Sequence, residues 1–432
     1  MVRERRVDVV VVGAGPAGVA AAWAARNAGA ESVLVLERDE DLGGILQQCI
    51  HPGFGVASFG EELTGPEFMA RWISRAREAG VIFAPGTLVT ALEADGVVET
   101  LSVREGVQTV TAGAVVLASG CRERPLGALG VPGTRPAGVF SAGTAQRLVN
   151  MEGFLPGRRV VVLGSGDIGL IMARRMIWEG ATVEGVYEAL PWPGGLRRNL
   201  AQCLDDYGVP LYLEHTITRL HGVQRLEGVT VARVDRQKRP LAGTERFVPC
   251  DTLLVAVGLI PETELARGAG LALDSVTGGL RVDQEGRTSA EGIFAAGNTV
   301  LVYDLADAAA EAGVRAGGAA ARRVRGLENR NPSLRRRFDV VPGKGVRLVA
   351  PGWWDIAPGG RGRAVIHLRV DRVWEEPCRV TTSPGGPSRT LPYARPGEMV
   401  ELALDGAILE ALPPDAHTLT VTVEPLKERG QG

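Results

Sequence analysis

The chain has few cysteines, and no two of them form a motif. The 432 residues include five, which are widely spaced (Cys49, Cys121, Cys203, Cys250 and Cys378). There is no CxxC and no Cys/His spacing typical of zinc, so a metal centre built on cysteine is not expected. A small secreted scaffold held by disulfides is also excluded, because this pattern is typical of a reducing compartment.

Charge of one sign and long apolar runs are lacking as well. Lys plus Arg total 48 against 50 Asp plus Glu, a net charge of -2, so nucleic acid is not an expected partner. No stretch reaches the roughly 18 apolar residues that a membrane span needs. The apolar run near the N-terminus is interrupted by Asp8 and by several glycines, which favours a strand leading into a helix over a signal peptide. We expect a cytoplasmic protein.

Two βαβ openings are present, at residues 7–39 and 158–189. Each consists of a Val-rich strand, a glycine turn, a helix and a second strand that ends in an acid. After the first opening, Thr64 and Glu67 fit a capping box and Pro66 suits a first helical turn, which predicts a helix from there to about residue 80. Because length predicts two or three domains, each opening is expected to begin a dinucleotide fold.

The order of patterns predicts a discontinuous first domain. We expect an α/β protein in which residues 1–123 and 250–330 form one Rossmann-like dinucleotide fold and residues 124–249 form a second, inserted one. In this scheme the strand-like run at 251–258 returns to the first domain. Residues 336–432 have short alternating runs with turn signals, which predict a small all-β sandwich-like domain after a linker at 328–338.

The first glycine turn is a G-x-G-x-x-G, with Gly13, Gly15 and Gly18 placed between strand and helix and Glu37 ending the next strand. The first glycine allows the tight turn, the second lets a pyrophosphate approach the backbone, and the third lets the helix meet the strand. The helix N-terminus adds N–H groups for the phosphates. Glu37 is expected to accept hydrogen bonds from the hydroxyls of an adenosine ribose.

The second turn repeats the pattern with Gly164, Gly166 and Gly169, and Glu188 follows at the same offset. An acid at this position bonds free ribose hydroxyls and repels a 2′-phosphate, so NAD(H) is expected over NADP(H). Two arginines further on, Arg197 and Arg198, are expected in a loop where they could moderate that preference. Two nucleotide sites in one chain predict a flavin in one and a nicotinamide in the other, with hydride passing between them.

Several further segments carry a resemblance. The stretches ASGCRERP (118–125), AVGLIPE (256–262) and TSAEGIFAAGN (288–298), together with the two fingerprints, resemble the two-dinucleotide-domain pyridine nucleotide–flavin oxidoreductases over residues 5–325. LGGILQQCIHPGFG, ELTGPEF and LGSGDIGLIMARRM look like a subgroup associated with FAD-dependent glycerol-3-phosphate dehydrogenase-like proteins. That subgroup is more distantly similar to subunits of opine oxidases and hydrogen cyanide synthase.

The resemblance implies FAD in the first fold and NAD(P)H in the second. The positions that it assigns to FAD are Gly13, Gly15, Pro16, Ala17, Gly18, Glu37, Arg38, Gly43, Gly44, Val89, Ser119, Gly120, Gly297 and Asn298. Those that it assigns to NAD(P)H are Gly164, Gly166, Asp167, Ile168, Gly169, Glu188 and Gly258. Asn298 stands where the family usually has aspartate, but an amide can still bond a hydroxyl. A helix that begins near Asp304 is expected to direct its N-terminus at the flavin.

The cysteine pair of disulfide reductases is missing from both of its usual places, which disfavours a dithiol reductase. Cys49 stands near one of those places, and His51 is the nearest candidate cation. A single thiol could cycle through sulfenic acid if its pKa were lowered by a helix N-terminus or by that cation. A redox role, a non-redox place beside flavin or substrate, and simple packing all stay open for Cys49.

Three functions follow as alternatives. The first is an FAD-dependent NAD(P)H oxidoreductase that passes electrons to an acceptor or to a partner flavoprotein. The second is a single-cysteine NADH peroxidase or oxidase that uses Cys49, and the third is a scaffold with a structural FAD. The macromolecular partners that the resemblance leaves open are a second flavoprotein subunit, a small cysteine-rich protein and a further copy of the chain.

Overall fold

The computed structural model describes residues 3–327, 336–356, 363–405, 412–413 and 415–426, so most of the expected linker at 328–338 lies outside the described residues. The chain forms two compact units. The first comprises Met1–Cys121, Pro261–Arg395 and Met399–Gly432, and the second comprises Arg122–Ile260 and Pro396–Glu398. Nearly all of the second unit is therefore inserted between two parts of the first.

The first unit contains a seven-stranded sheet. Its strands are β1 (Arg3–Val12), β2 (Val33–Leu36), β5 (Ile82–Ala84), β6 (Thr87–Leu92), β7 (Val97–Ser102), β8 (Gly106–Leu117) and β19 (Ile293–Ala295). The order is β5-β2-β1-β8-β7-β6, and β19 also pairs with β8. The parallel part, made of β5, β2, β1, β8 and β19, has the Rossmann-like arrangement that the first glycine turn predicts.

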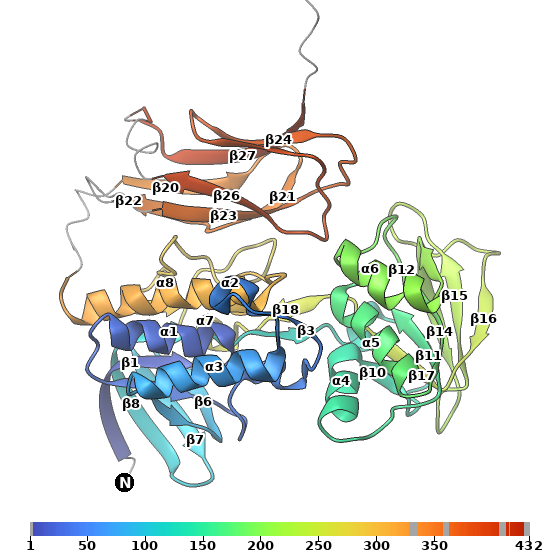
Figure 1. Ribbon diagram of the computed structural model, residues 1–432, viewed down its shortest axis with the longest axis horizontal. Coiled ribbons are helices and arrows are strands. Elements are labelled where there is room, and N and C mark those ends of the chain that lie inside the picture. Colours follow the sequence, from blue (N-terminus) through green and yellow to red (C-terminus); the bar gives the residue numbers. More distant parts are fainter. Residues whose placement is uncertain (1–2, 328–335, 357–362, 406–411, 414, 427–432) are drawn as a thin grey trace, which may run out of the picture. The chain divides into compact units, whose positions relative to one another are not determined.

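Three helices cover one face of this sheet, as Figure 1 shows: α1 (Pro16–Asn27), α3 (Gly65–Glu78) and α8 (Ala306–Val324). Side chains alternate along β1, so Val9 and Val11 pack against these helices while Val10 and Val12 pack on the opposite face. Helices α1 and α8 are in very close contact. A Cβ added at Gly317 would lie 2.0 Å from the Ala21 carbonyl oxygen.

Helix α3 confirms the capping box. Thr64 Oγ1 accepts from the Glu67 backbone N at 3.4 Å, and Glu67 Oε2 accepts from the Thr64 backbone N at 2.9 Å. The remaining short elements of this fold are η1 (Gly44–Gln48), β3 (Pro52–Phe54), α2 (Val56–Phe59), β4 (Leu63–Thr64), α7 (Glu264–Gly268) and η4 (Gly297–Thr299).

The second unit is a complete dinucleotide fold of its own. Its parallel sheet has the order β10-β17-β11-β12-β13, with β10 (Val139–Ser141), β11 (Arg159–Leu163), β12 (Thr182–Glu188), β13 (Leu211–Leu213) and β17 (Thr252–Val255). A second, antiparallel sheet consists of β14 (His215–His221), β15 (Gly228–Arg233) and β16 (Arg246–Pro249). The helical segments are η2 (Leu126–Leu129), α4 (Ala142–Asn150), α5 (Asp167–Trp178), α6 (Arg197–Cys203) and η3 (Asp205–Tyr207).

Two expectations about this unit are corrected. The sequence pattern assigns strand β17 to the first domain, but β17 pairs with β10 and β11 inside the inserted sheet. The later boundary of the insertion therefore lies at 260/261 rather than 249/250, because a buried apolar strand gives no signal of which parallel sheet it joins. Arg197 and Arg198 begin α6 and do not lie in a loop. Short strands β9 (Cys121–Glu123) and β18 (Leu259–Pro261) mark the two crossings of the chain.

The C-terminal region is sheet-rich, as predicted. One sheet has the order β22-β20-β27-β24-β25 and the other has the order β21-β23-β26. The strands are β20 (Arg336–Pro342), β21 (Val346–Ala350), β22 (Trp353–Ile356), β23 (Arg363–Val370), β24 (Cys378–Ser383), β25 (Ser388–Leu391), β26 (Val400–Asp405) and β27 (Thr418–Pro425). Side chains of both sheets, including Phe338, Ile366 and Val421, share one apolar core.

Candidate functional site

The first glycine turn is packed at two of its glycines and open at the third. Gly13 has φ +101°, and a Cβ there would lie 2.5 Å from the Ala118 carbonyl oxygen. A Cβ on Gly18 would lie 1.9 Å from the Gly13 carbonyl oxygen, whereas one on Gly15 would meet no atom of the described residues within 4 Å. The backbone at Gly15, at the N-terminus of α1, is thus free for the close approach of a ligand.

Glu37 follows β2 beside this turn. Its Oε2 accepts from the Ala14 backbone N at 2.7 Å and its Oε1 from the Asp39 backbone N at 3.0 Å. The side chain is 6% exposed, yet each oxygen keeps a lone pair beyond those bonds, so the carboxylate can still accept from hydroxyls. The neighbouring Arg38 is exposed, and Pro16 forms the first turn of α1.

The glycine pair and Gly297 meet the same turn. Gly43 donates its backbone N–H to the Ala14 carbonyl at 3.0 Å, and a Cβ on Gly44 would lie 3.2 Å from the Cα of Gly15. A Cβ on Gly297 would lie 2.6 Å from the Cβ of Ala17. All three glycines have positive φ, and Gly43 and Gly297 are buried, so the absence of side chains lets these segments pack closely on the turn.

Asn298 is anchored on both of its amide atoms. Its Nδ2 donates to Cys121 Sγ at 3.4 Å, and its Oδ1 accepts from the Tyr303 backbone N at 3.1 Å. Two residues before Cys121, Ser119 Oγ donates to the Glu262 carbonyl at 2.9 Å. Gly120 has φ +74°, with open space among the described residues where its Cβ would be.

Val89 lies on β6. It pairs with Thr100 in the β6–β7 ladder, and its side chain is buried. The residue of β6 that bonds Glu37 is Thr87, whose backbone N donates to the Glu37 carbonyl at 2.7 Å. Leu88, between them, is exposed.

The start of α8 holds the loop that follows Cys49, through a residue that sequence reasoning missed. Asp307, in the first turn of the helix, accepts from the Gly55 backbone N at 2.9 Å and from the Ser58 backbone N at 2.8 Å. Acids are common in first helical turns. The sequence alone therefore does not predict that Asp307 bonds a segment about 250 residues away. Helix α8 begins two residues after Asp304, near the predicted start.

Cys49 is a buried thiol at the C-terminal end of a helical turn, where a thiolate is not stabilised. It is the C-cap of η1 and is 8% exposed, packed in the core beside α3. Burial raises the pKa of the Cys49 thiol to about 12. A thiolate is favoured by a helix N-terminus and disfavoured by the carbonyl end, so the helix geometry does not provide the condition for a reactive thiol.

His51 belongs to the same loop and contacts Pro52 and Phe54. Its Nδ1 lies 3.0 Å from the Pro52 carbonyl oxygen, and its ring centroid lies 5.1 Å from that of Phe54. The next residue, Pro52, begins the short strand β3, which pairs with β4. Cys49 is also held at its backbone, because its carbonyl accepts from the Gly65 N at 2.8 Å.

The second glycine turn repeats the first in detail. Gly164 has φ +97°, and its Cβ would lie 2.2 Å from the Ala256 carbonyl oxygen. A Cβ on Gly169 would lie 2.7 Å from the Gly164 carbonyl oxygen. A Cβ on Gly166 would meet, among the described residues, only the Ala256 oxygen, at 3.8 Å. Again the middle glycine faces space while the outer two are packed, as close ligand approach at the N-terminus of α5 requires.

The polar residues of the second turn are largely engaged. Glu188 Oε2 accepts from the backbone N and from the Oγ of Ser165, at 3.0 and 2.7 Å, and its Oε1 accepts from the Leu190 N at 2.9 Å. Asp167 Oδ1 accepts from the Leu196 N at 2.9 Å and from Asn199 Nδ2 at 2.6 Å. Asp167 therefore holds the segment that enters α6.

Two more of the assigned residues belong to this unit. Ile168, in the first turn of α5, packs at the edge of the core. Gly258 has φ +104°, and a Cβ there would meet nothing within 4 Å in the described part of the chain.

A cavity of about 320 Å³ is lined in part by the residues that directly follow Glu188 in the chain. Its lining includes Leu190 and Trp192 from the loop beyond β12, and Arg236 and Lys238 from the turn after β15. The Trp192 indole and these two cations, with the acids Glu214 and Asp235 also in the lining, are groups that could contact the adenosine part of a dinucleotide.

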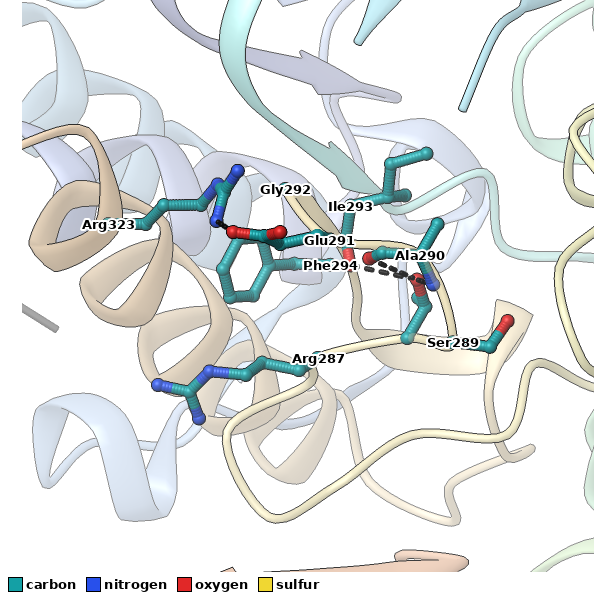
Figure 2. Close-up of a pocket in the computed structure, with 9 residues that line it drawn as sticks. Arg287, Ser289, Ala290, Glu291, Gly292, Ile293, Phe294 and Arg323 are labelled. Carbon is teal, nitrogen blue, oxygen red and sulfur yellow. Dashed lines mark hydrogen bonds and ion pairs between the residues drawn. The ribbon is translucent and has the colours of Figure 1, made fainter. Parts of the chain in front are cut away.

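Another cavity, of about 240 Å³, is shown in Figure 2 and does not belong to the site. It is lined by residues 287–294 and Arg323, and an ion pair joins Arg323 to Glu291 at 2.6 Å. It lies where β19 begins, whereas Gly297 follows the end of β19. Ligands of parallel α/β sheets bind at the carboxyl ends of the strands.

The comparisons with known proteins agree with this geometry. Residues 7–313 match the family described as pyridine nucleotide-disulphide oxidoreductase. The chain belongs to this family. It is an FAD-dependent pyridine nucleotide oxidoreductase, an enzyme with two nucleotide-binding folds. Although the family name refers to a disulfide, each of the five cysteines is a thiol.

Three curated relatives illustrate the range of the family. An opine oxidase subunit from Agrobacterium tumefaciens (strain Ach5) is 28% identical over 315 residues, 67% of this chain and 61% of the relative. The ferredoxin reductase component of chlorobenzene dioxygenase from Cupriavidus sp. (strain PS12) is 32% identical over 298 residues, 67% of this chain and 66% of the relative. Thioredoxin reductase of Listeria innocua is 27% identical over 301 residues, 68% of this chain and 86% of the relative. The chain thus spans under two thirds of the first two relatives.

Among solved structures, thioredoxin reductase from T. acidophilum has a TM-score of 0.62 and 24% identity, covering 75% of this chain and all of that chain. This likeness shows the fold. In the described part of the chain, no helix is both long enough and apolar enough to cross a membrane.

Proposed function

We propose that the chain binds FAD at the Gly13–Gly18 turn and NAD(P)H at the Gly164–Gly169 turn, and that NAD(P)H reduces the flavin. The observation that carries the proposal is the paired geometry of the two turns, in each of which the middle glycine alone faces space. Bound FAD supplies an acceptor for hydride from a nicotinamide. The chain's own contribution is to bind and orient, so no catalytic triad is needed.

Residues of the first unit have distinct parts in this proposal. The backbone at Gly15 and the N-terminus of α1 would hold the pyrophosphate, and Glu37 would accept from the adenosine ribose. Gly44 and Gly297 let their segments pack closely on Gly15 and Ala17 of that turn, and the Gly43 N–H donates to the Ala14 carbonyl. Asn298, held by Tyr303 and Cys121, would offer its amide in place of the usual carboxylate.

NADH is proposed as the preferred donor over NADPH. Glu188 is an acid at the ribose position, and it is fixed there by three hydrogen bonds from Ser165 and Leu190. A fixed carboxylate repels a 2′-phosphate more effectively than a mobile one. Arg236 and Lys238 line the adjoining cavity together with the acids Glu214 and Asp235, so its lining adds no net positive charge that would favour a 2′-phosphate.

The acceptor is proposed to be carried by a partner. Several relatives are components of larger systems, among them subunits of opine oxidase and hydrogen cyanide synthase and ferredoxin reductase components of dioxygenases. The association with glycerol-3-phosphate dehydrogenase-like proteins and with a small cysteine-rich protein remains part of the proposal. The absence of a dithiol motif from the sequence favours such a carrier over a disulfide substrate.

The single-cysteine peroxidase is the weaker alternative. It needs a thiolate at Cys49, but burial raises the pKa of that thiol to about 12 and η1 presents its carbonyl end to it. The scaffold alternative makes no use of the second glycine turn, whose geometry matches the first.

Anaerobic titration of the purified protein, loaded with FAD, with NADH and separately with NADPH tests the proposal. Bleaching of the flavin absorbance near one equivalent of NADH is expected, with slower bleaching by NADPH. A Gly166→Ala variant is the matched control, because it should keep FAD and lose the rapid bleaching. A bound flavin that neither coenzyme reduces would refute the proposed electron transfer and support the scaffold. A peroxide turnover abolished in Cys49→Ser would favour the single-thiol enzyme.

A further inference from the structure

The C-terminal β domain holds the short segment that joins Asn298 to helix α8. Arg369, on β23, forms an ion pair with Asp304 Oδ1 and also donates from Nη2 to the Val302 carbonyl at 3.3 Å. The backbone N of Met399, just before β26, donates to Asp304 Oδ2 at 2.6 Å. Both side chains of the ion pair are nearly buried, 11% exposed for Arg369 and 13% for Asp304. Removing one partner of this pair is therefore more costly than breaking an exposed surface pair.

Aromatic packing adds a second contact at the same place. The ring of His367, also on β23, lies edge-on to Tyr303 with centroids 5.1 Å apart at 86°. Burial, with a smaller effect of Arg315, lowers the pKa of His367 to about 4, and burial raises the pKa of Tyr303. Both rings are uncharged at physiological pH, so neither ring changes its protonation state there.

The held segment belongs to the proposed flavin site. The Tyr303 backbone N donates to Asn298 Oδ1 at 3.1 Å, and Gly297, the residue before Asn298, lies against Ala17 of the first glycine turn. Three residues after Asp304, Asp307 binds the backbone of the loop at Gly55 and Ser58. One short stretch of chain thus connects the first glycine turn, the loop after Cys49 and the β domain.

We propose that Arg369 is a positioning residue for FAD, which acts through Asp304 to fix residues 298–304 and the start of α8. The inference rests on the proposed FAD site. It assigns the β domain a part in flavin binding, since that domain supplies Arg369, His367 and the Met399 N–H. It also predicts an electrostatic effect, because the pair is nearly buried and an unbalanced charge there is poorly screened.

The test uses the full-length, FAD-loaded protein with the variants Arg369→Gln, Asp304→Asn and the double variant. Arg369→Gln should raise the dissociation constant of FAD by about fivefold or more. It should also lower the flavin midpoint potential, because the remaining Asp304 carboxylate opposes the gain of electrons. Asp304→Asn should raise the potential, and the double variant should return it towards the wild-type value.

Arg281→Gln is the matched control. Arg281 joins Asp339 of the β domain at 2.7 Å and, among the described residues, has no hydrogen bond or ion pair with 302–304. This variant should therefore keep the wild-type potential and affinity for FAD. Arg369→Lys provides a second variant if the glutamine variant does not fold. The lysine should keep the potential while weakening FAD binding.

The outcomes separate the two levels of the proposal. If Arg369→Gln matches Arg281→Gln in FAD affinity and potential, the positioning role is refuted while FAD binding stands. The charge argument fails if the double variant shifts the potential as far as Arg369→Gln does. A wild-type protein that takes up no FAD would refute the proposed function, and this inference with it.

Discussion

Substitution of Gly15 by alanine should separate ligand binding from folding. Gly15 has an extended backbone, φ −74° and ψ −174°, which alanine adopts without strain, and its added Cβ would meet no atom of the described residues within 4 Å. Replacing a glycine at such a position stabilises a fold by about 0.4–1 kcal/mol, because the unfolded chain loses freedom. The flavin-free Gly15→Ala protein should therefore be at least as stable as the wild type.

The same methyl group would occupy the space through which FAD approaches the backbone. Overpacking by one methyl group costs about 1–3 kcal/mol, a loss of roughly 5- to 150-fold in affinity. Gly18→Ala gives the opposite pattern, since its Cβ would lie 1.9 Å from the Gly13 carbonyl oxygen. That variant should lose about 3 kcal/mol or more of stability.

The assay combines two measurements on each variant. Urea unfolding of the flavin-free protein gives the free energy of unfolding, and titration with FAD gives the dissociation constant. Gly166→Ala serves as the internal control, because it should keep FAD affinity and raise the KM for NADH. A Gly15→Ala protein that binds FAD as tightly as the wild type, or that is clearly less stable without it, would refute the assignment of this turn.

Three other predictions follow from single contacts. Cys49→Ser should keep NADH-dependent flavin reduction, and alkylation of Cys49 in the native protein should be negligible at neutral pH. The pKa of the folded Cys49 thiol, about 12, lies above the ordinary 9.0. The stability that this shift contributes is therefore complete below pH 9 and is lost as pH rises towards 12. Rapid alkylation of Cys49 at neutral pH would contradict the raised pKa. Glu188→Ser should raise the ratio of kcat/KM for NADPH over NADH by about tenfold, and an unchanged ratio in steady-state assays would show that Glu188 does not face the ribose. Gly317→Ala should prevent close packing of α8 on α1 and lower the free energy of unfolding by about 3 kcal/mol. Gly318→Ala is the control, because its Cβ would lie 3.5 Å from Arg322 Nη1, and it should unfold at or above the wild-type urea concentration.

Local patterns were sufficient to predict much of the two turns. Spacing alone assigns separate roles to Gly13, Gly15 and Gly18, and in the structure two of them are packed and one is open. This packing was predictable because the strand, turn and helix of each motif are contiguous in the chain. The capping box at Thr64 was predictable for the same reason.

Contacts between distant segments were not predictable. Strand β17 has the apolar composition of any buried parallel strand, so its sequence did not say that it pairs with β10 and β11. The sequence left the pKa of the Cys49 thiol open, because that pKa depends on burial. The core in which Cys49 lies includes Phe68 and Met69, which come later in the chain. Asp307 and Arg369 carried no signal at all, since isolated charged residues are common on helices and strands.

The sequence by itself determined that this protein has two dinucleotide folds, one inserted in the other, and which glycines and acids form each turn, because those features are encoded over short spans. Tertiary structure alone decided that Asn298, Tyr303 and Asp304 are joined to Arg369 of the β domain, and that Cys49 is buried and protonated. Burial and ion pairing depend on which surfaces pack together, and no local pattern in one chain specifies that.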